Sequence, residues 1–160
     1  MKIVFSLKIK VLIAAFFYLF GFFSINNATA QQQYNASALE HLKRSLNFMM
    51  SGDYLNAIAS CNQLIRLDAN STVNYIIRAR AYYEIGEYDL AISDCNLVTG
   101  LDRNNTAAYN IRANCYRQKG DLSKAIAEWQ TALRINPGLE EARVNIELAR
   151  AALSARQQAN

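Results

Sequence analysis

The chain has 160 residues with 17 Lys and Arg, 13 Asp and Glu and one His, which gives a formal net charge of +4 at pH 7. Lys2, Lys8 and Lys10 lie within the first thirty positions, so the remainder carries 14 basic against 13 acidic residues and is nearly neutral. This balance argues against a nucleic-acid or anionic-membrane partner, which an extended basic surface would attract.

The first thirty residues have the three parts of a secretory signal peptide. Basic residues precede an apolar run from Val11 to Phe23, and a polar stretch then ends in Ala28-Thr29-Ala30. The apolar run is shorter than the about 20 residues that a membrane-spanning helix needs, and the small residues suit cleavage before Gln31. We expect residues 1–30 to be removed, the mature protein to have no stable membrane anchor, and its location to be periplasmic or secreted.

A period of 34 residues governs the rest of the chain. Gly52, Gly86 and Gly120 recur at that interval. Each is followed by an acidic residue, then by Tyr or Leu, and three residues further on by an Ala-Ile pair. Internal periods of this length are typical of stacked helical hairpins. Before the first hairpin, residues 31–37 are polar, and we expect a flexible leader there because three consecutive glutamines have no apolar face to bury.

The middle repeat shows the helical spacing most clearly. Small and apolar residues fall on one stripe across 75–85 and on a second across 91–98, and Gly86 between them lets the chain reverse. Polar loops at 68–71 and 102–105 separate successive hairpins. We therefore expect repeats over 38–71, 72–105 and 106–139 and a capping helix over 140–157.

Three positions on each first helix and two on each second helix alternate between large and small residues, and a proline follows the second helix of the third repeat. They are Tyr109, Ala113, Tyr116, Ala125, Trp129 and Pro137 in the third repeat, Tyr75, Ala79, Tyr82, Ala91 and Cys95 in the second, and His41, Ser45, Phe48, Ala57 and Cys61 in the first. This pattern resembles the tetratricopeptide repeat family. The resemblance implies an all-α fold, a right-handed superhelix of stacked antiparallel helical hairpins.

The final helix has no partner of its own. We expect Ala142, Ile146 and Ala149 to cover the outer apolar side of the third hairpin, as capping helices do in repeat proteins. Its charged residues would stay in water: Glu140, Glu141, Arg143, Arg150 and Arg156.

A charge recurs where the family usually has leucine, at Arg44, Arg78 and Arg112. A charge at a partly buried helix position needs a partner. Asp94 and Glu128 follow the second and third arginines by sixteen positions on the return helix, whereas Ser60 stands at that place after the first. We expect two ion pairs within hairpins, with anion binding as the alternative, and we expect the first repeat to be the least satisfied.

Catalysis finds little support in the sequence. His41 is the single histidine, and no nucleophile arrangement, phosphate-binding glycine loop or metal-ligand cluster is recognisable. Cys61 and Cys95 stand at a core position and are small buried hydrophobes in the simplest interpretation. Cys115 lies on a helix that stacks against the one carrying Cys95, so a Cys95–Cys115 disulfide is a candidate in an oxidising compartment. We expect no enzyme activity, no cofactor and no metal.

The resemblance implies a groove, lined by the first helices of the hairpins, that holds an extended peptide or a partner helix. The inward positions are Leu39, Leu42, Leu46 and Met49 in the first repeat, Val73, Ile76, Arg80 and Tyr83 in the second, and Ala107, Asn110, Asn114 and Arg117 in the third. The groove thus runs from apolar to polar. One subfamily grips a C-terminal carboxylate with lysines and asparagines here; because this chain has Leu42, Leu46 and Ala107, we do not expect that ligand.

These features favour a non-catalytic adaptor or scaffold that binds a protein or peptide outside the cytoplasm. The alternative is a structural protein that forms a homodimer through the apolar face of its first helix. Both would cover the apolar stripe of the first repeat, because exposed apolar stripes usually mark a partner site. In a third interpretation, the leader or a shifted helix phase covers that stripe within the molecule.

Overall fold

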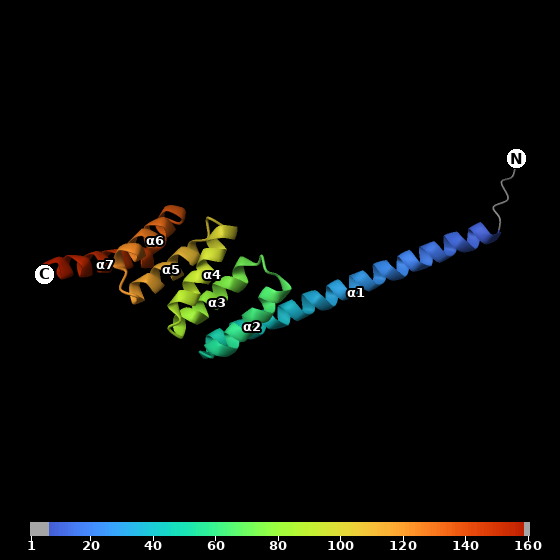
Figure 1. The fold of residues 1–160 in the computed structure, drawn as a ribbon, viewed down its shortest axis with the longest axis horizontal. Coiled ribbons are helices and arrows are strands. Elements are labelled where there is room, and N and C mark those ends of the chain that lie inside the picture. The colour runs from blue at the N-terminus through green and yellow to red at the C-terminus, as the bar shows by residue number, and fades with distance from the viewer. Residues whose placement is uncertain (1–6, 159–160) are drawn as a thin grey trace. The chain divides into compact units, whose positions relative to one another are not determined.

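The computed structural model describes the backbone of residues 7–158 and, within it, the side chains of residues 27 and 29–158. The described chain consists of helices joined by short turns, with no strand between residues 7 and 158. The expected all-α class is therefore confirmed. The helices are α1 (Leu7–Ser51), α2 (Tyr54–Leu67), α3 (Thr72–Glu84), α4 (Tyr88–Leu101), α5 (Thr106–Gln118), α6 (Leu122–Ile135) and α7 (Glu140–Gln158) (Figure 1).

The chain divides into two compact units, residues 1–39 and residues 40–160, which we call the N-terminal and C-terminal units. The expected signal peptide falls in the N-terminal unit, and most of its side chains lie outside the described residues, so its cleavage stays a prediction. Among the residues that the structure describes, no helix is long and apolar enough to cross a membrane.

The leader differs from our expectation. Residues 31–37 are helical and exposed within α1, whereas their polar composition led us to expect a flexible segment. Alanine and glutamine are good helix formers, and extending an existing helix costs far less than nucleating one. A polar segment next to a formed helix can therefore continue it without an apolar face.

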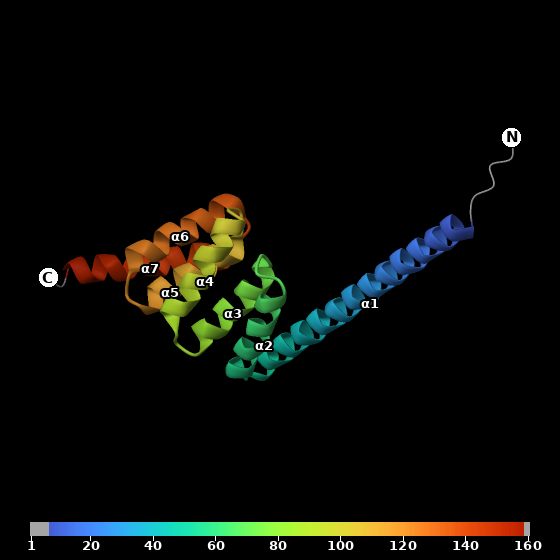
Figure 2. The same ribbon diagram turned by 45° about the vertical axis from the view of Figure 1, so that its right-hand side comes forward.

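In the C-terminal unit, each helix from α2 to α7 packs against the next one in the chain, and α3 also contacts α5. Figures 1 and 2 show these helices stacked in chain order as successive hairpins. The contact between α3 and α5 brings together the first helices of two neighbouring hairpins. This stacking places the first helices on a shared side of the unit.

The turns inside the hairpins depend on the recurring glycines. Gly52, Gly86 and Gly120 have φ values of 76°, 83° and 82°, in the left-handed region that side chains with a Cβ rarely adopt. A Cβ built on any of the three meets nothing within 4 Å. Backbone conformation, and not lack of space, therefore requires glycine at these positions.

The loops between hairpins also repeat. In each, the residue that ends the helix accepts a hydrogen bond from the backbone N–H two residues later, at 2.9 Å for Asp68, 3.0 Å for Asp102 and 3.1 Å for Asn136. Such local bonds compete with further helix and favour a turn. Asn105 then begins α5 by accepting from the N–H of Ala108 at 3.1 Å. The polar loops at 68–71 and 102–105 thus lie between successive hairpins.

The cap formed by α7 is part of the core. Ala142, Ile146 and Ala149 are 0%, 5% and 3% exposed and share a cluster with the fully buried Trp129 of α6. The charged residues of α7 are exposed: Glu140, Glu141, Arg143, Arg150 and Arg156. The expected division of α7 into a buried apolar face and a solvent-exposed charged face is confirmed.

Candidate partner-binding surface

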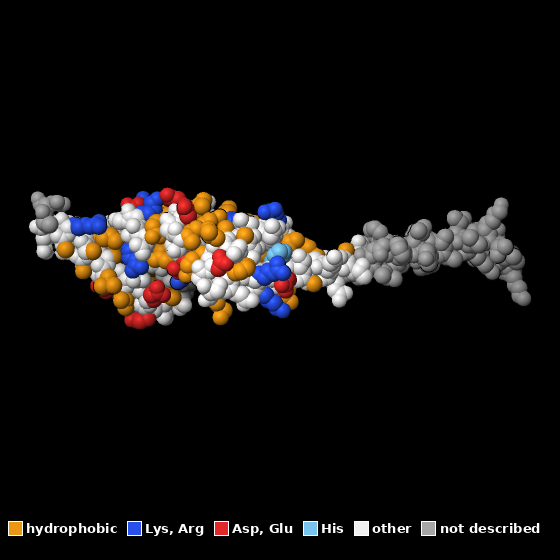
Figure 3. All heavy atoms as spheres, turned by 90° about the horizontal axis from the view of Figure 1, so that it is seen from below, with side chains coloured by type: hydrophobic (Ala, Val, Ile, Leu, Met, Phe, Trp, Pro, Cys, Tyr) orange, Lys and Arg blue, Asp and Glu red, His pale blue; other side chains and the backbone are white. Residues whose placement is uncertain are grey.

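The apolar end of the expected groove lies on α1 and α3. Leu46 and Val73 are 45% and 55% exposed, and Leu42 and Ile76 are half-buried. We call Leu42, Leu46, Val73 and Ile76 the apolar surface. Figure 3 shows hydrophobic side chains spread among polar and charged ones over the C-terminal unit. Leu39 is 53% exposed but belongs to the N-terminal unit, so it is not part of this surface.

Met49, which we expected at the end of the exposed stripe, is turned toward the protein interior. Met49 is half-buried and packs, with Phe48, against a small core of Ala57, Ile58 and Ala81. Met50 is 87% exposed. The reason is that α1 is joined to α2 and α3 through this small core, which turns Met49 inward; the next residue on the helix then faces water.

The middle of the groove is held by contacts between α3 and α5. Tyr83 packs on the core and its hydroxyl accepts a hydrogen bond from Gln118 Nε2 at 3.2 Å. Arg80 pairs with Glu84 at 2.6 Å, and its guanidinium lies 5.9 Å from the centre of the Tyr83 ring. Arg80 remains exposed, so this part offers a cation beside an aromatic ring.

The polar end of the groove is engaged inside the protein. Asn110 Oδ1 accepts a hydrogen bond from the indole N–H of Trp129 at 3.1 Å, and Arg117 donates to Asn145 Oδ1 at 3.2 Å. Asn114 is 8% exposed. Asn110 and Arg117 are half-buried and already have internal partners, because a buried indole needs an acceptor and Asn145 of α7 accepts from Arg117. A role for these residues in partner contact stays a prediction.

Two largely buried ion pairs connect the two helices of the second and third hairpins, as expected. Arg78 donates from Nε and Nη2 to the two carboxylate oxygens of Asp94 at 2.8 and 2.7 Å, a bidentate arrangement. Arg112 donates to Glu128 at 2.7 Å. The hydrogen bond to Asp94 raises the pKa of Arg78 above its ordinary value. Both guanidiniums thus have an internal acid, which removes the anion-binding alternative for them.

The sequence analysis missed a second partner of each arginine. Arg78 also donates to Asn62 Oδ1 at 2.6 Å, and Arg112 donates to Asn96 Oδ1 at 2.7 Å. Each asparagine stands sixteen residues before its arginine, on the second helix of the preceding hairpin. The recurrence of Asn62 and Asn96 at the 34-residue period was the available signal. Each arginine therefore links two successive hairpins.

Comparison with known proteins agrees with this geometry. The sequence profile of the tetratricopeptide repeat matches residues 74–105 and, again, residues 106–139. The chain is a tetratricopeptide repeat protein. A search of curated proteins found no match.

Solved tetratricopeptide repeat domains share the fold over most of the chain. The first such domain of human RPAP3 is 26% identical, with a TM-score of 0.72, and the match covers 77% of this chain and 97% of that one. The first domain of Spaghetti (RPAP3), solved with the HSP90 peptide SRMEEVD, is 27% identical, with a TM-score of 0.71 and coverage of 74% and 94%. MamA is 28% identical, with a TM-score of 0.70 and coverage of 76% and 71%. The expected superhelix of stacked hairpins is confirmed.

The cysteines of this tetratricopeptide repeat protein pack in its core. Cys61, Cys95 and Cys115 are free thiols with 0% exposure, so the candidate Cys95–Cys115 disulfide is not formed in this structure. Cys95 and Cys115 share one apolar cluster, and burial raises the pKa of each to about 12 and that of Cys61 to about 11. The thiols are uncharged at neutral pH and act as small hydrophobes. Among the described residues, no group of three His, Cys, Asp or Glu could hold a metal.

Proposed function

We propose that this tetratricopeptide repeat protein is a non-catalytic adaptor that binds a protein or peptide through its apolar surface. The observation that carries the proposal is the exposure of Leu46 and Val73 on the first helices of two successive hairpins. Large apolar side chains exposed together on such a helical face commonly mark a partner site. Two similar structures contain bound peptides: an HSP90 peptide in the first domain of Spaghetti, and an HSP70 peptide in the second human RPAP3 domain, which is 26% identical to this chain.

Replacing Leu42 and Leu46 together by aspartate tests this surface. We expect partner capture to be lost, because two charges would have to be buried at the interface, while helical content and melting temperature barely change. Affinity capture from the native compartment with mass spectrometry reports the partner, and circular dichroism reports the fold. A purified protein that elutes as a dimer, and as a monomer in this variant, would identify a second copy as the occupant.

The matched control replaces Leu55 and Leu90, which are 70% and 47% exposed on α2 and α4. Aspartate at both should leave partner capture unchanged, since these second helices lie away from the apolar surface. Unfolding of the Leu42 and Leu46 variant would show instead that the stripe is core. Equal loss of capture in both variants would contradict a localised site.

We further propose that the adaptor acts outside the cytoplasm, in the periplasm or as a secreted protein. The support is the order of basic, apolar and small residues over positions 1–30. N-terminal sequencing of the protein recovered from cells should begin at Gln31, in a fraction that needs no detergent. Membrane-bound protein that retains Met1 would contradict export by cleavage.

A further inference from the structure

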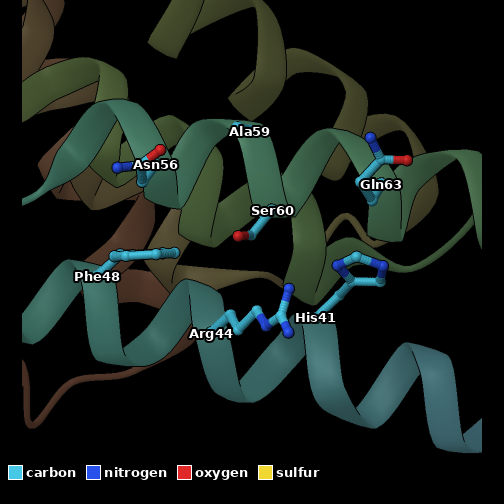
Figure 4. A pocket seen from close by; sticks show the side chains of 7 residues that line it. All are labelled: His41, Arg44, Phe48, Asn56, Ala59, Ser60 and Gln63. Carbon is cyan, nitrogen blue, oxygen red and sulfur yellow. The ribbon is translucent and has the colours of Figure 1, made fainter.

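The first hairpin contains an open pocket of about 400 Å³ between the end of α1 and α2. Figure 4 shows the Arg44 guanidinium and the Ser60 hydroxyl entering the gap from its opposite sides. All of the lining residues belong to the C-terminal unit: His41, Arg44, Phe48, Asn56, Ala59, Ser60 and Gln63. None of them is acidic.

The same place is filled in the other two hairpins. Arg44 corresponds to Arg78 and Arg112 at the 34-residue period, and Ser60 corresponds to the carboxylates of Asp94 and Glu128 that receive those guanidiniums. A serine hydroxymethyl group is shorter than either acid and carries no charge. The first hairpin thus keeps the cation but lacks the anion that the fold places beside it elsewhere.

A second difference widens the pocket. His41 stands where the later hairpins have Tyr75 and Tyr109, whose hydroxyls donate to the carbonyl oxygens of Ala69 and Arg103 in the preceding loops, at 3.1 and 3.2 Å. The tyrosine rings also lie near the arginines, at 5.5 Å for Arg78 and 5.2 Å for Arg112. The smaller imidazole leaves the space beside Arg44 open.

Arg44 has a weak substitute for the missing acid. It pairs with Glu40 on its own helix at 3.1 Å, with the two side chains 58% and 57% exposed, against 17% and 4% for Arg78 and Asp94. Exposed pairs one turn apart on a helix contribute little and exchange readily. Arg44 can therefore turn to a better-placed carboxylate in the pocket.

The hydrogen-bond donors that line this pocket suit a carboxylate. The Arg44 guanidinium can bind one in bidentate geometry, and the Ser60 hydroxyl makes no hydrogen bond to any described residue. Gln63 adds an amide N–H₂, whereas the amide of Asn56 already donates to Asp53 at 2.7 Å. We infer that this pocket binds a carboxylate of an acidic peptide segment, which takes the place of Asp94 and Glu128 in the first hairpin. The site is separate from the apolar surface and goes beyond the function proposed above.

The test uses the purified full chain in a non-ionic detergent, with the Arg44 Nε–H signal followed by NMR. The probe is the peptide acetyl-Gly-Glu-Gly-amide, and its Gln counterpart is the uncharged control. We expect saturable binding of the Glu peptide on the order of millimolar and none of the Gln peptide. Acetyl-Gly-Gly-Gly with a free carboxyl end distinguishes a chain terminus from an acidic side chain as the source.

The variant Ser60→Asp supplies the missing acid from within the chain. It should weaken Glu-peptide binding about tenfold or more, as expected for a lost charge-assisted contact, and shift the Arg44 signal without any ligand. Ser60→Asn, of the same size but neutral, should keep binding, and Glu40→Gln should strengthen it by removing the competing carboxylate. The inference would be overturned if Ser60→Asp bound the Glu peptide as well as the parent does, or if the Gln peptide bound as well as the Glu peptide. Tighter binding of inorganic phosphate than of either carboxylate peptide would also overturn it.

Discussion

Asp94→Ala is expected to lower the free energy of unfolding by about 3–5 kcal/mol, the range for breaking a buried ion pair. The Asp94 side chain is 4% exposed and receives two hydrogen bonds from Arg78, whose own side chain is 17% exposed. Removing the carboxylate leaves a largely buried guanidinium with Asn62 as its remaining hydrogen-bond acceptor. Urea denaturation followed by circular dichroism measures the loss.

The control for this prediction is Asp89→Ala on the same helix. Asp89 pairs with Lys119, but its side chain is 83% exposed, so we expect a loss of about 1 kcal/mol or less. Combining Asp94→Ala with Arg78→Leu should recover much of the stability, because the isolated charge is then gone. A double-mutant cycle without coupling between Arg78 and Asp94 would contradict the assignment.

Trp129→Ala is expected to cost about 3–5 kcal/mol, as large-to-small changes of a buried aromatic do. Trp129 is fully buried and packs with Ala142 and Ile146 of α7, so its removal opens a cavity between the third hairpin and the cap. The change also leaves Asn110 Oδ1 without the indole N–H that it accepts. Thermal and urea unfolding by circular dichroism are suitable, since fluorescence of the single tryptophan is lost.

Two variants separate packing from hydrogen bonding at this site. Trp129→Phe keeps most of the apolar volume, so we expect a smaller loss of unfolding free energy, about 1–3 kcal/mol. This loss reports the unpaired amide oxygen of Asn110 and the residual cavity. Leu148→Ala, at a residue of α7 that is 62% exposed, should change stability by about 0.5 kcal/mol or less. If Trp129→Ala were no worse than Leu148→Ala, α7 would not be part of the folded core.

The hairpin turns, the loops and the ion pairs could be predicted because each depends on residues at fixed separations. The glycines at the 34-residue period require φ values that other residues avoid, and the polar residues ending the helices bond backbone two positions away. Arg78 with Asp94 and Arg112 with Glu128 recur sixteen residues apart, within one hairpin. Such local or periodic relations can be recognised in the sequence without knowledge of the tertiary structure.

Residues of the candidate site were less predictable, because their exposure depends on what packs across from them. Asn110 and Arg117 look like open polar contacts in the sequence, but Trp129 and Asn145 engage them from α6 and α7. Met49 turns inward and Met50 outward because of a small core shared with α2 and α3. A helix position sets only a direction from the axis, not what lies in that direction.

The sequence by itself determined the repeat, the family and the turns that glycine forms inside the hairpins. It also showed that two of the three recurring arginines have an acid sixteen residues later and that the first has none. Only the tertiary structure decided which groove residues remain free, that Cys95 and Cys115 pack as thiols, and that a pocket opens beside Arg44. The physical reason is that backbone conformation and charge pairing within a hairpin are short-range in the chain. Burial is the sum of contacts from several helices and appears only when they are stacked.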